Sequence, residues 1–411
     1  MFSSHSLADM RVKNMSGILR YLRALSFIAL AWVIFSSGIG YSSSVDSPSA
    51  SARLAEELDQ IRLSQGEGWR VIVPGMSAAL LSANQSGELI AAATGTADPP
   101  GAVPLAMADR FHMGSITKTF TAALMLQLVQ EERFSLSDPI SRWISYPGGA
   151  SITIEMLLGH TSGVPNFNEL PGFSPDLTPL QSIALAAKQP LQFPPGSDWA
   201  YSNTNYIILG VIAERVTGMP WPTLLDERFF EPLSLTDTYV FTGEPHAPTI
   251  IGSRLDCGFP NEPECVKRPG FSIIPVTNGF DWVVAWSAGA IVSTPSDIAK
   301  WIKALTNGEV INTAHTQLMM TASPQSRRVL SEQPAYGTMR WTGCGLGLLE
   351  YEFEGHGTGW GHEGAITGFV ANAVHMNVSG KTFAFAVNFQ QVNGFEVLGQ
   401  LVSSGTEKLT R

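Results

Sequence analysis

Charged residues are scarce in this sequence, at 15% of 411 positions, and cysteine occurs only three times. The low charge, combined with a hydrophobic content of 44%, excludes an intrinsically disordered chain and indicates a globular protein with a sizeable core. No spacing of cysteine and histidine resembles a zinc site, so neither a metal nor another cofactor is expected. The net charge of −10 argues against nucleic acid as a partner, because nucleic acid selects basic surfaces.

The N-terminal region differs from the rest in charge and hydropathy. Residues 1–45 carry a net charge of +3, which leaves −13 on the remainder of a chain whose total is −10. Basic residues precede the apolar run 24–35, and Ser-rich sequence follows it, which is the order of an export signal. The run is shorter than the roughly 20 residues of a membrane-spanning helix. We therefore expect export, with residues 1–51 as a signal peptide or an uncleaved membrane anchor followed by a linker.

The three cysteines suggest one local disulfide. Cys257 and Cys265 lie eight positions apart in a loop rich in Pro, Gly and Asn, and they are a plausible pair in an exported protein. Cys344 is then left unpaired.

Hydrophobic patterns predict strands near both ends of the chain and helices between them. Predicted strands cover Met76–Ser82, Glu88–Thr94, Gly364–Met376 and Lys381–Asn388. Predicted helices cover 52–65, 116–132, 296–306 with Ser296 as its cap, and 394–409, with further helices starting near Thr153, Thr178 and Asn205 and a stop at Gly218. The fold class is therefore α+β, with an antiparallel sheet built from both chain ends and flanked by helices. One domain, 52–411, would comprise a sheet subdomain (52–128 and 286–411) and an inserted helical subdomain (129–285).

Ser115 precedes Lys118 by three positions at the start of a long apolar helical run. Residues i and i+3 share a helix face, which sets an amine beside a hydroxyl. A serine hydroxyl becomes a good nucleophile only when a nearby base accepts its proton. The same pattern also fits a helix N-terminus with a solvated lysine, so further motifs are needed to decide between the two interpretations.

Two further motifs follow in order. Tyr201-Ser202-Asn203 stands in a Pro/Gly/Asn-rich segment just before a predicted helix, where it could equally be a capping turn. His362-Glu363-Gly364 ends a glycine-dense run, and glycines in a strand allow a ligand to approach the backbone closely.

Together these motifs resemble those of the penicillin-recognising serine hydrolases, which include β-lactamases, penicillin-binding proteins, related esterases and D-amino-acid peptidases. The stretches 152–163, 201–218 and 286–294 are also similar to family segments. A histidine in the third motif is more similar to the secreted D-alanyl-D-alanine carboxypeptidases than to β-lactamases, which usually carry lysine there. The resemblance implies the β-lactamase/transpeptidase-like fold.

The resemblance also implies roles for individual residues. Ser115 would attack a carbonyl to form an acyl-enzyme, and Lys118 and Tyr201 would share the acid and base work, with His362 beside them. A tyrosinate at neutral pH requires nearby cations, and a neutral Lys118 is the alternative base. Substrate-binding groups would be Asn203, Glu363 and Gly364, and the oxyanion hole would use the backbone N–H groups of Ser115 and Ala365.

The third motif departs from the family pattern. Glu363 replaces the usual Thr or Ser, whose hydroxyl helps to hold a substrate carboxylate. Leu349 stands where the carboxypeptidases carry an arginine, and Glu350, Glu352 and Glu354 surround it. These acids would repel a free carboxylate, so we expect a preference for amides, esters or amine-bearing leaving ends.

Several activities remain open at this point. A D-alanyl-D-alanine carboxypeptidase-like enzyme or D-amino-acid peptidase leads, followed by an esterase or amidase of the same fold and by a β-lactamase. An inactive binder of cell-wall fragments is the alternative outside enzymes. The expected partner is a small peptide, ester or β-lactam, and the oligomeric state is left undetermined. Ser287 and His160 are interpreted as structural residues.

Overall fold

The computed structural model describes residues 48–67, 71–83, 87–99, 101–243, 250–256, 272–276 and 281–407. The predicted export signal and the cysteines Cys257 and Cys265 lie outside these residues. From Pro48 onward the chain forms one compact unit. Within the described ranges, no helix is long and apolar enough to cross a bilayer.

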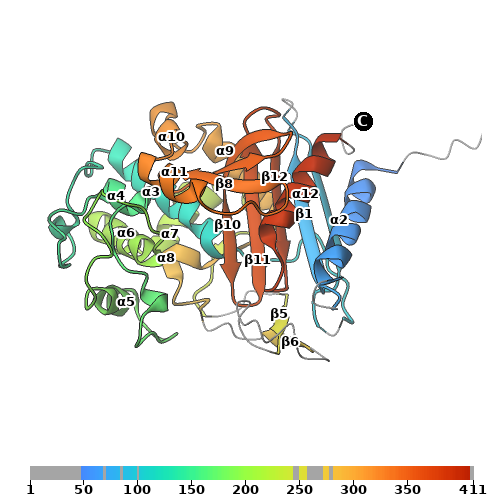
Figure 1. The fold of residues 1–411 in the computed structure, drawn as a ribbon, viewed down its shortest axis with the longest axis horizontal. Helices are drawn as coiled ribbons and strands as arrows, with labels where there is room; N and C mark the ends of the chain where they lie inside the picture. The colour runs from blue at the N-terminus through green and yellow to red at the C-terminus, as the bar shows by residue number, and fades with distance from the viewer. Residues whose placement is uncertain are drawn as a thin grey trace, which may run out of the picture. The chain divides into compact units, whose positions relative to one another are not determined.

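A seven-stranded antiparallel sheet is the centre of the structure (Figure 1). Its strands run in the order β2 (Leu89–Gly95), β1 (Gly75–Leu81), β12 (Thr382–Val387), β11 (Phe369–Met376), β10 (Gly357–Ile366), β9 (Leu349–Phe353) and β8 (Met339–Cys344). Because β1 pairs with β12, strands from the N-terminal and C-terminal parts of the chain lie side by side in one sheet. The predicted α+β fold with a sheet built from both ends is therefore confirmed.

Alternation along the strands gives this sheet two apolar faces. In β1, Ala79 and Leu81 belong to one buried cluster, while Ala78 and Leu80 belong to the other. The helices α2 (Ala50–Glu67) and α12 (Gly394–Glu407) cover the cluster that contains Ala78 and Leu80. Helix α9 (Pro295–Thr306) covers the cluster that contains Ala79 and Leu81.

The middle of the chain forms a mostly helical lobe beside the sheet (Figure 1). Its helices are α3 (Thr117–Gln130), α4 (Ile154–Leu158), α5 (Pro179–Ala186), α6 (Asn203–Thr217), α7 (Trp221–Leu225) and α8 (Trp286–Gly289). Helices α3 and α8, which the predicted bounds assign mostly to the sheet subdomain, pack with α6 in this lobe. Helix α3 is the core of the lobe, because 11 of its 14 residues are buried. The helices α10 (Thr313–Met319) and α11 (Pro324–Ser331) follow α9, and α11 packs on β8.

Local signals predicted several helix ends correctly. Thr153 caps α4, Thr178 forms a capping box at α5, and Gly218 ends α6 in the left-handed conformation with φ of 74°.

Two element predictions were wrong. The cap of α9 is Thr294 rather than Ser296, because Pro295 occupies the first helical position. The predicted strand Gly364–Met376 is the end of β10, a turn at Thr367 and Gly368, and β11. Gly368 adopts φ of 88° and turns the chain within the apolar run that the sequence pattern predicted to be a single strand.

The loop-rich segment from 240 to 285 contains short strands that the sequence did not reveal. Strand β4 (Tyr239–Val240) joins β3 (Phe111–His112) and β7 (Ile291–Ser293) in a small sheet, and β5 (Gly252–Leu255) pairs with β6 (Ile273–Val276). The pairing of β3 with β7 holds the segment that leads into Ser115.

Candidate active site

Ser115 lies in a single 3-10 turn, η1 (Gly114–Ile116), that leads directly into α3. The turn starts from a fixed point, because the N–H of Met113 donates to the carbonyl oxygen of Ile291 at 2.8 Å. Gly114 adopts φ of 50°, a left-handed conformation that favours glycine. The strand-to-helix transition thus presents Ser115 one turn before Lys118.

Lys118 is fully buried, and its Nζ makes three hydrogen bonds. Nζ lies 3.0 Å from Ser115 Oγ, 2.7 Å from Asn203 Oδ1 and 2.8 Å from the carbonyl oxygen of Ala288. Burial lowers the pKa of Lys118 well below 10.5, and the charge of Glu363 opposes this only in part. A neutral amine has two N–H groups for the two carbonyl acceptors and one lone pair for the serine proton, which matches this arrangement.

Tyr201 is half-buried and hydrogen-bonded to Ser115. Its ring centroid lies 4.9 Å from Lys118 Nζ. Burial raises the pKa of Tyr201 well above 10, and the bond to Ser115 offsets only part of that rise. Tyr201 is therefore a neutral phenol, and of the two bases considered from the sequence the geometry favours Lys118.

His362 is buried and uncharged. Burial lowers its pKa to about 3, with a further contribution from Lys118. Its Nδ1 lies 2.6 Å from the carbonyl oxygen of Glu363, so Nδ1 carries the proton and Nε2 the lone pair. Its ring centroid lies 6.3 Å from that of Tyr201. An uncharged imidazole supplies no cation to lower the pKa of Tyr201.

Strand β10 passes close to the serine turn at Gly364 and Ala365. A Cβ atom on Gly364 would lie 1.9 Å from the carbonyl oxygen of Met113 and 3.2 Å from the backbone N of Ser115. A Cβ atom on Gly114 would lie 3.0 Å from the backbone N of Ala365. Only glycine permits this contact, which brings the two predicted oxyanion-hole amides of Ser115 and Ala365 to the same place.

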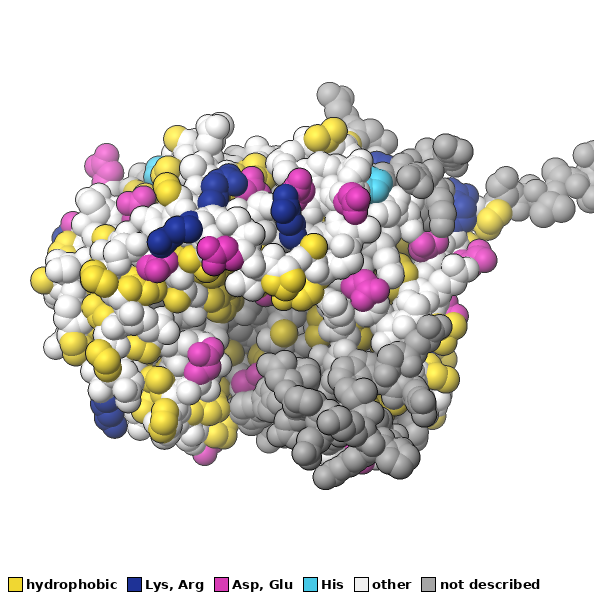
Figure 2. Space-filling view, viewed as in Figure 1, with side chains coloured by type: hydrophobic (Ala, Val, Ile, Leu, Met, Phe, Trp, Pro, Cys, Tyr) yellow, Lys and Arg dark blue, Asp and Glu magenta, His cyan; other side chains and the backbone are white. Residues whose placement is uncertain are grey.

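A cavity of about 440 Å³ opens at Ser115. Its lining includes Asn203 and Ala365 together with two carboxylates that the sequence interpretation missed, Glu169 and Asp281. Burial raises the pKa of Asp281, which accepts a hydrogen bond from the N–H of Thr367 at 3.2 Å. No Lys or Arg is among the described residues that line it. Figure 2 shows a hollow near the middle of the face viewed.

Glu169 and Asp281 lie in segments without a motif, which is why sequence patterns did not single them out. Asp281 lies near the end of the loop-rich segment, and Glu169 ends the short turn η3 (Phe167–Glu169). Ala288 contributes only its carbonyl oxygen, a role that any residue type could fill.

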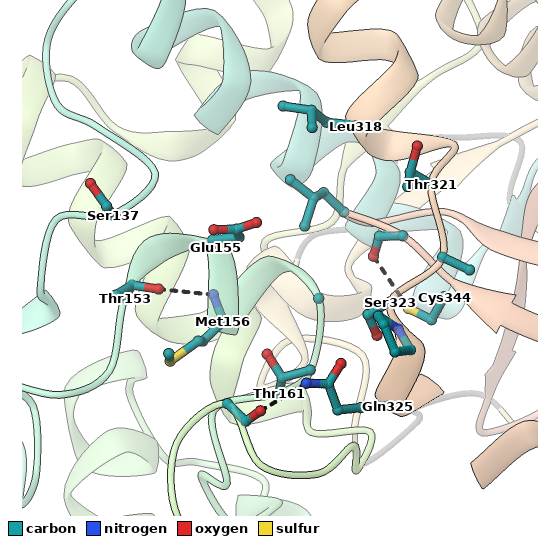
Figure 3. A pocket seen from close by; sticks show the side chains of 16 residues that line it. Ser137, Thr153, Glu155, Met156, Thr161, Leu318, Thr321, Ser323, Gln325 and Cys344 are labelled. Atoms are coloured by element: carbon teal, nitrogen blue, oxygen red, sulfur yellow. Dashed lines mark hydrogen bonds between the residues drawn. The ribbon is translucent and has the colours of Figure 1, made fainter. Parts of the chain in front are cut away.

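A second cavity, of about 420 Å³, lies between α4 and the segment from Leu318 to Gln325 (Figure 3). None of the predicted site residues lines it. Cys344 borders it as a free, buried thiol whose pKa burial raises to about 12, which leaves it protonated and unreactive.

His160 and Ser287 have structural surroundings. His160, at the end of α4, stacks on the Tyr201 ring with centroids 4.5 Å apart and accepts the N–H of Ser202 at 3.1 Å. Ser287 Oγ donates to the carbonyl oxygen of Tyr206 at 2.9 Å. Among the residues that the structure describes, no three His, Cys, Asp or Glu side chains are grouped to hold a metal ion.

Comparison with known proteins gives a consistent family. The family model described as Beta-lactamase matches residues 67–401. Penicillin-binding protein 4 of Amycolatopsis lactamdurans is 27% identical over 345 residues, which are 80% of this chain and 86% of that protein. Unguisins hydrolase ungD of Aspergillus violaceofuscus is 29% identical over 230 residues, 52% of this chain but only 39% of that protein. The structure of D-amino acid amidase from Ochrobactrum anthropi SV3, complexed with D-phenylalanine, is 25% identical with a TM-score of 0.73, covering 86% of this chain and 99% of that one.

Proposed function

The chain belongs to the beta-lactamase family of serine hydrolases, and on that premise we propose that it cleaves amide or ester bonds of D-amino-acid peptides and amides through an acyl-enzyme on Ser115. The observation that carries this proposal is the buried Lys118 amine, 3.0 Å from Ser115 Oγ and with its two other contacts on carbonyl oxygens. An amine held in that way is a base ready for the serine proton.

The proposed acylation begins when Ser115 Oγ attacks the substrate carbonyl carbon and its proton passes to Lys118 Nζ. The negative oxygen of the tetrahedral intermediate accepts hydrogen bonds from the N–H groups of Ser115 and Ala365. As the bond from the carbonyl carbon to the leaving nitrogen or oxygen breaks, the Lys118 proton returns to that atom by way of the Tyr201 hydroxyl. Water then attacks the acyl-enzyme, releasing the acid and restoring the Ser115 hydroxyl.

The surroundings of Ser115 favour leaving ends without a free carboxylate. Leu349 is a buried core residue, so the position of the carboxypeptidase arginine holds no cation. Glu350 and Glu352 form ion pairs with Arg327 and Arg340, so they contribute less repulsion than their sequence positions suggested. The preference therefore rests on the absence of Lys and Arg from the described cavity lining and on the carboxylates of Glu169 and Asp281.

The name of the amidase with a similar structure supports this substrate class. A D-alanyl-D-alanine carboxypeptidase is the second candidate, and the observation in its favour is the histidine at position 362. A β-lactamase fits the site less well, since His362 is uncharged. An inactive binder also fits less well, since the Ser115–Lys118 pair is complete. We also propose that the protein is exported, on the pattern of residues 1–51.

A two-part experiment tests the proposal. Purified protein and the Ser115→Ala variant are incubated with a fluorescent penicillin and an activated ester, and covalent labelling is followed by intact mass. Labelling of the wild type alone is expected, whereas failure of every reagent to acylate Ser115 would favour the binder. Turnover of an acyl-D-Ala-D-Ala peptide is then compared with that of its amide and methyl ester, and a clear advantage for the free acid would contradict the substrate preference.

A further inference from the structure

The turn between β10 and β11 is bonded to a segment that also forms part of the cavity at Ser115. The turn consists of Thr367 and Gly368. The N–H of Thr367 donates to the carboxylate of Asp281 at 3.2 Å, and the carbonyl oxygen of Thr367 accepts the indole Nε1–H of Trp282 at 2.9 Å. Two consecutive side chains therefore hold both backbone groups of Thr367.

The two backbone groups of Gly368 are bonded by other parts of the chain. Its N–H donates to Gln390 Oε1 at 3.3 Å, and its carbonyl oxygen accepts the N–H of Ser253 at 3.2 Å. Backbone groups at the tip of a hairpin are ordinarily bonded to water, because such turns lie at the surface. A turn whose four backbone groups are all bonded within the protein is held firmly in place. This turn begins two positions after Ala365, whose N–H belongs to the proposed oxyanion hole.

Trp282 also contacts the strand that leads into Ser115. Its ring stacks on the imidazole of His112, in β3, with ring centroids 4.1 Å apart and ring planes inclined by 22°. The side chains of Trp282 and His112 are both buried, so the stack is part of the core. One indole thus contacts the chain three positions before Ser115 and, through its N–H, the chain two positions after Ala365.

The position of Ala365 needs support from this turn. Strand β9 pairs with β10 only as far as Gly361, so β9 does not hold the segment 362–366 that passes Ser115. A Cβ atom on Gly114 would lie 3.0 Å from the backbone N of Ala365, so the two backbones are in close contact there. A displacement of about 1 Å in an active site can lower the rate by about 100-fold. The bonds to Thr367 fix the end of β10 against such a displacement.

We propose that Asp281 and Trp282 are positioning residues for the acyl-enzyme reaction, which keep the N–H of Ala365 directed at the oxyanion by holding both backbone groups of Thr367. Trp282 links the two strands that carry the oxyanion amides, and Asp281 fastens the turn to the wall of the cavity. Neither side chain exchanges a proton with the substrate. This inference rests on the proposed acyl-enzyme function.

The test measures kcat and KM with an uncharged chromogenic ester, on which the charge of Asp281 has little direct effect. Trp282→Phe removes the indole N–H but keeps an aromatic ring to stack on His112, and Asp281→Ala removes the carboxylate. Each should lower kcat by about 10- to 100-fold, because a displaced oxyanion donor costs part of the roughly 10²–10³-fold that a deleted donor costs. The oxyanion hole serves acylation and deacylation alike, so KM should stay within about threefold of the wild-type value. Asp281→Asn keeps an acceptor for the Thr367 N–H and should restore most of the kcat that Asp281→Ala loses.

A control variant and an inhibitor separate positioning from general stability. Gln390→Ala removes the bond to the N–H of Gly368 in the same turn, and its kcat should stay within about threefold of wild type because the bonds to Thr367 remain. A boronic acid adds to Ser115 Oγ as a tetrahedral anion with one oxygen in the oxyanion hole. Its Ki should rise in Trp282→Phe by the same factor as kcat falls, since the adduct resembles the tetrahedral intermediate. Urea titrations show whether each variant is folded.

The outcomes distinguish the positioning role from the hydrolase function. Wild-type kcat and Ki in a folded Trp282→Phe or Asp281→Ala variant overturn the positioning role, as does an equal fall of kcat in Gln390→Ala. A loss confined to KM also overturns it, because the side chains would then contact the substrate. If the wild type neither hydrolyses the ester nor binds the boronic acid, the hydrolase function fails and the positioning role fails with it. Asp281 is only partly buried, so its variants keep the test decisive where Trp282→Phe does not fold.

Discussion

Lys118 and Tyr201 both contact the Ser115 hydroxyl, and replacing each in turn shows which one takes its proton. Lys118→Met removes the amine while keeping a flexible chain of similar length, and the loss of a general base is expected to slow acylation by about 10²–10⁴-fold. With an activated ester, whose leaving oxygen needs no proton from Tyr201, Tyr201→Phe removes only one hydrogen bond to Ser115, a contribution of about 1–2 kcal/mol, which corresponds to about 5- to 30-fold. The lysine variant should therefore be the slower of the two, by at least about threefold.

Pre-steady-state acylation by an activated ester, followed by intact mass, gives both rates directly. Tyr206→Phe is the matched control, because its ring centroid is 5.5 Å from Lys118 Nζ but its hydroxyl donates to the carbonyl oxygen of Leu158. That variant should acylate within about threefold of the wild type while losing about 1 kcal/mol of stability. Equal losses in Lys118→Met and Tyr201→Phe would refute the assignment of Lys118 as the base.

Three further predictions concern charge and close packing. Asn203→Asp places an anion beside Lys118 Nζ, so it should raise the pKa of Lys118. In a pH–rate profile of acylation from pH 5 to 9, the acid limb should therefore shift to higher pH, and an unchanged limb would contradict a neutral lysine base. His112 is buried with a pKa of about 3, below the unfolded value of 6.5, so the folded state loses stability as the pH falls. Urea titrations of the His112→Phe variant should show a loss of stability between pH 7 and 5 that is smaller than the wild-type loss by about 2 kcal/mol. Equal losses in both proteins would rule this out. Gly364→Ala should slow acylation at least 100-fold, because the added Cβ atom would displace Met113. Gly159→Ala is the control and should not have this effect, since the atom nearest to its added Cβ would lie 3.4 Å away.

Local sequence signals predicted the parts of the site that depend on local structure. Ser115 and Lys118 are one helical turn apart, so their contact follows from the period of the helix alone. Thr153 and Thr178 cap their helices through hydroxyl groups that bond within three residues. Such features do not depend on where the rest of the chain lies.

Contacts between residues far apart in the sequence were predicted only where a family motif suggested them, and the others were missed. The proximity of Ser115 to Tyr201 and Ala365 depends on the packing of the helical lobe against β10, which no local pattern encodes. Asp281 reaches the cavity from a segment without periodicity. The repulsion expected from Glu350 was overestimated, because sequence alone does not place Arg327 beside it, at 2.7 Å. The titration states of Lys118 and Glu363 depend on burial, which likewise follows from the tertiary structure.

The pairing of β1 with β12 has a consequence for how this protein comes into existence. Residue 76 pairs with residue 387, so β1 cannot pair with β12 until the chain has been synthesised past residue 387. Ser115 and Lys118 are synthesised early, but Ala365 arrives some 250 residues later, as their numbers show. A nascent chain therefore holds the proposed nucleophile and its base without the second half of the proposed oxyanion hole. Such non-local pairing slows folding and leaves strand edges exposed meanwhile, so we expect the proposed hydrolytic activity only at the end of folding.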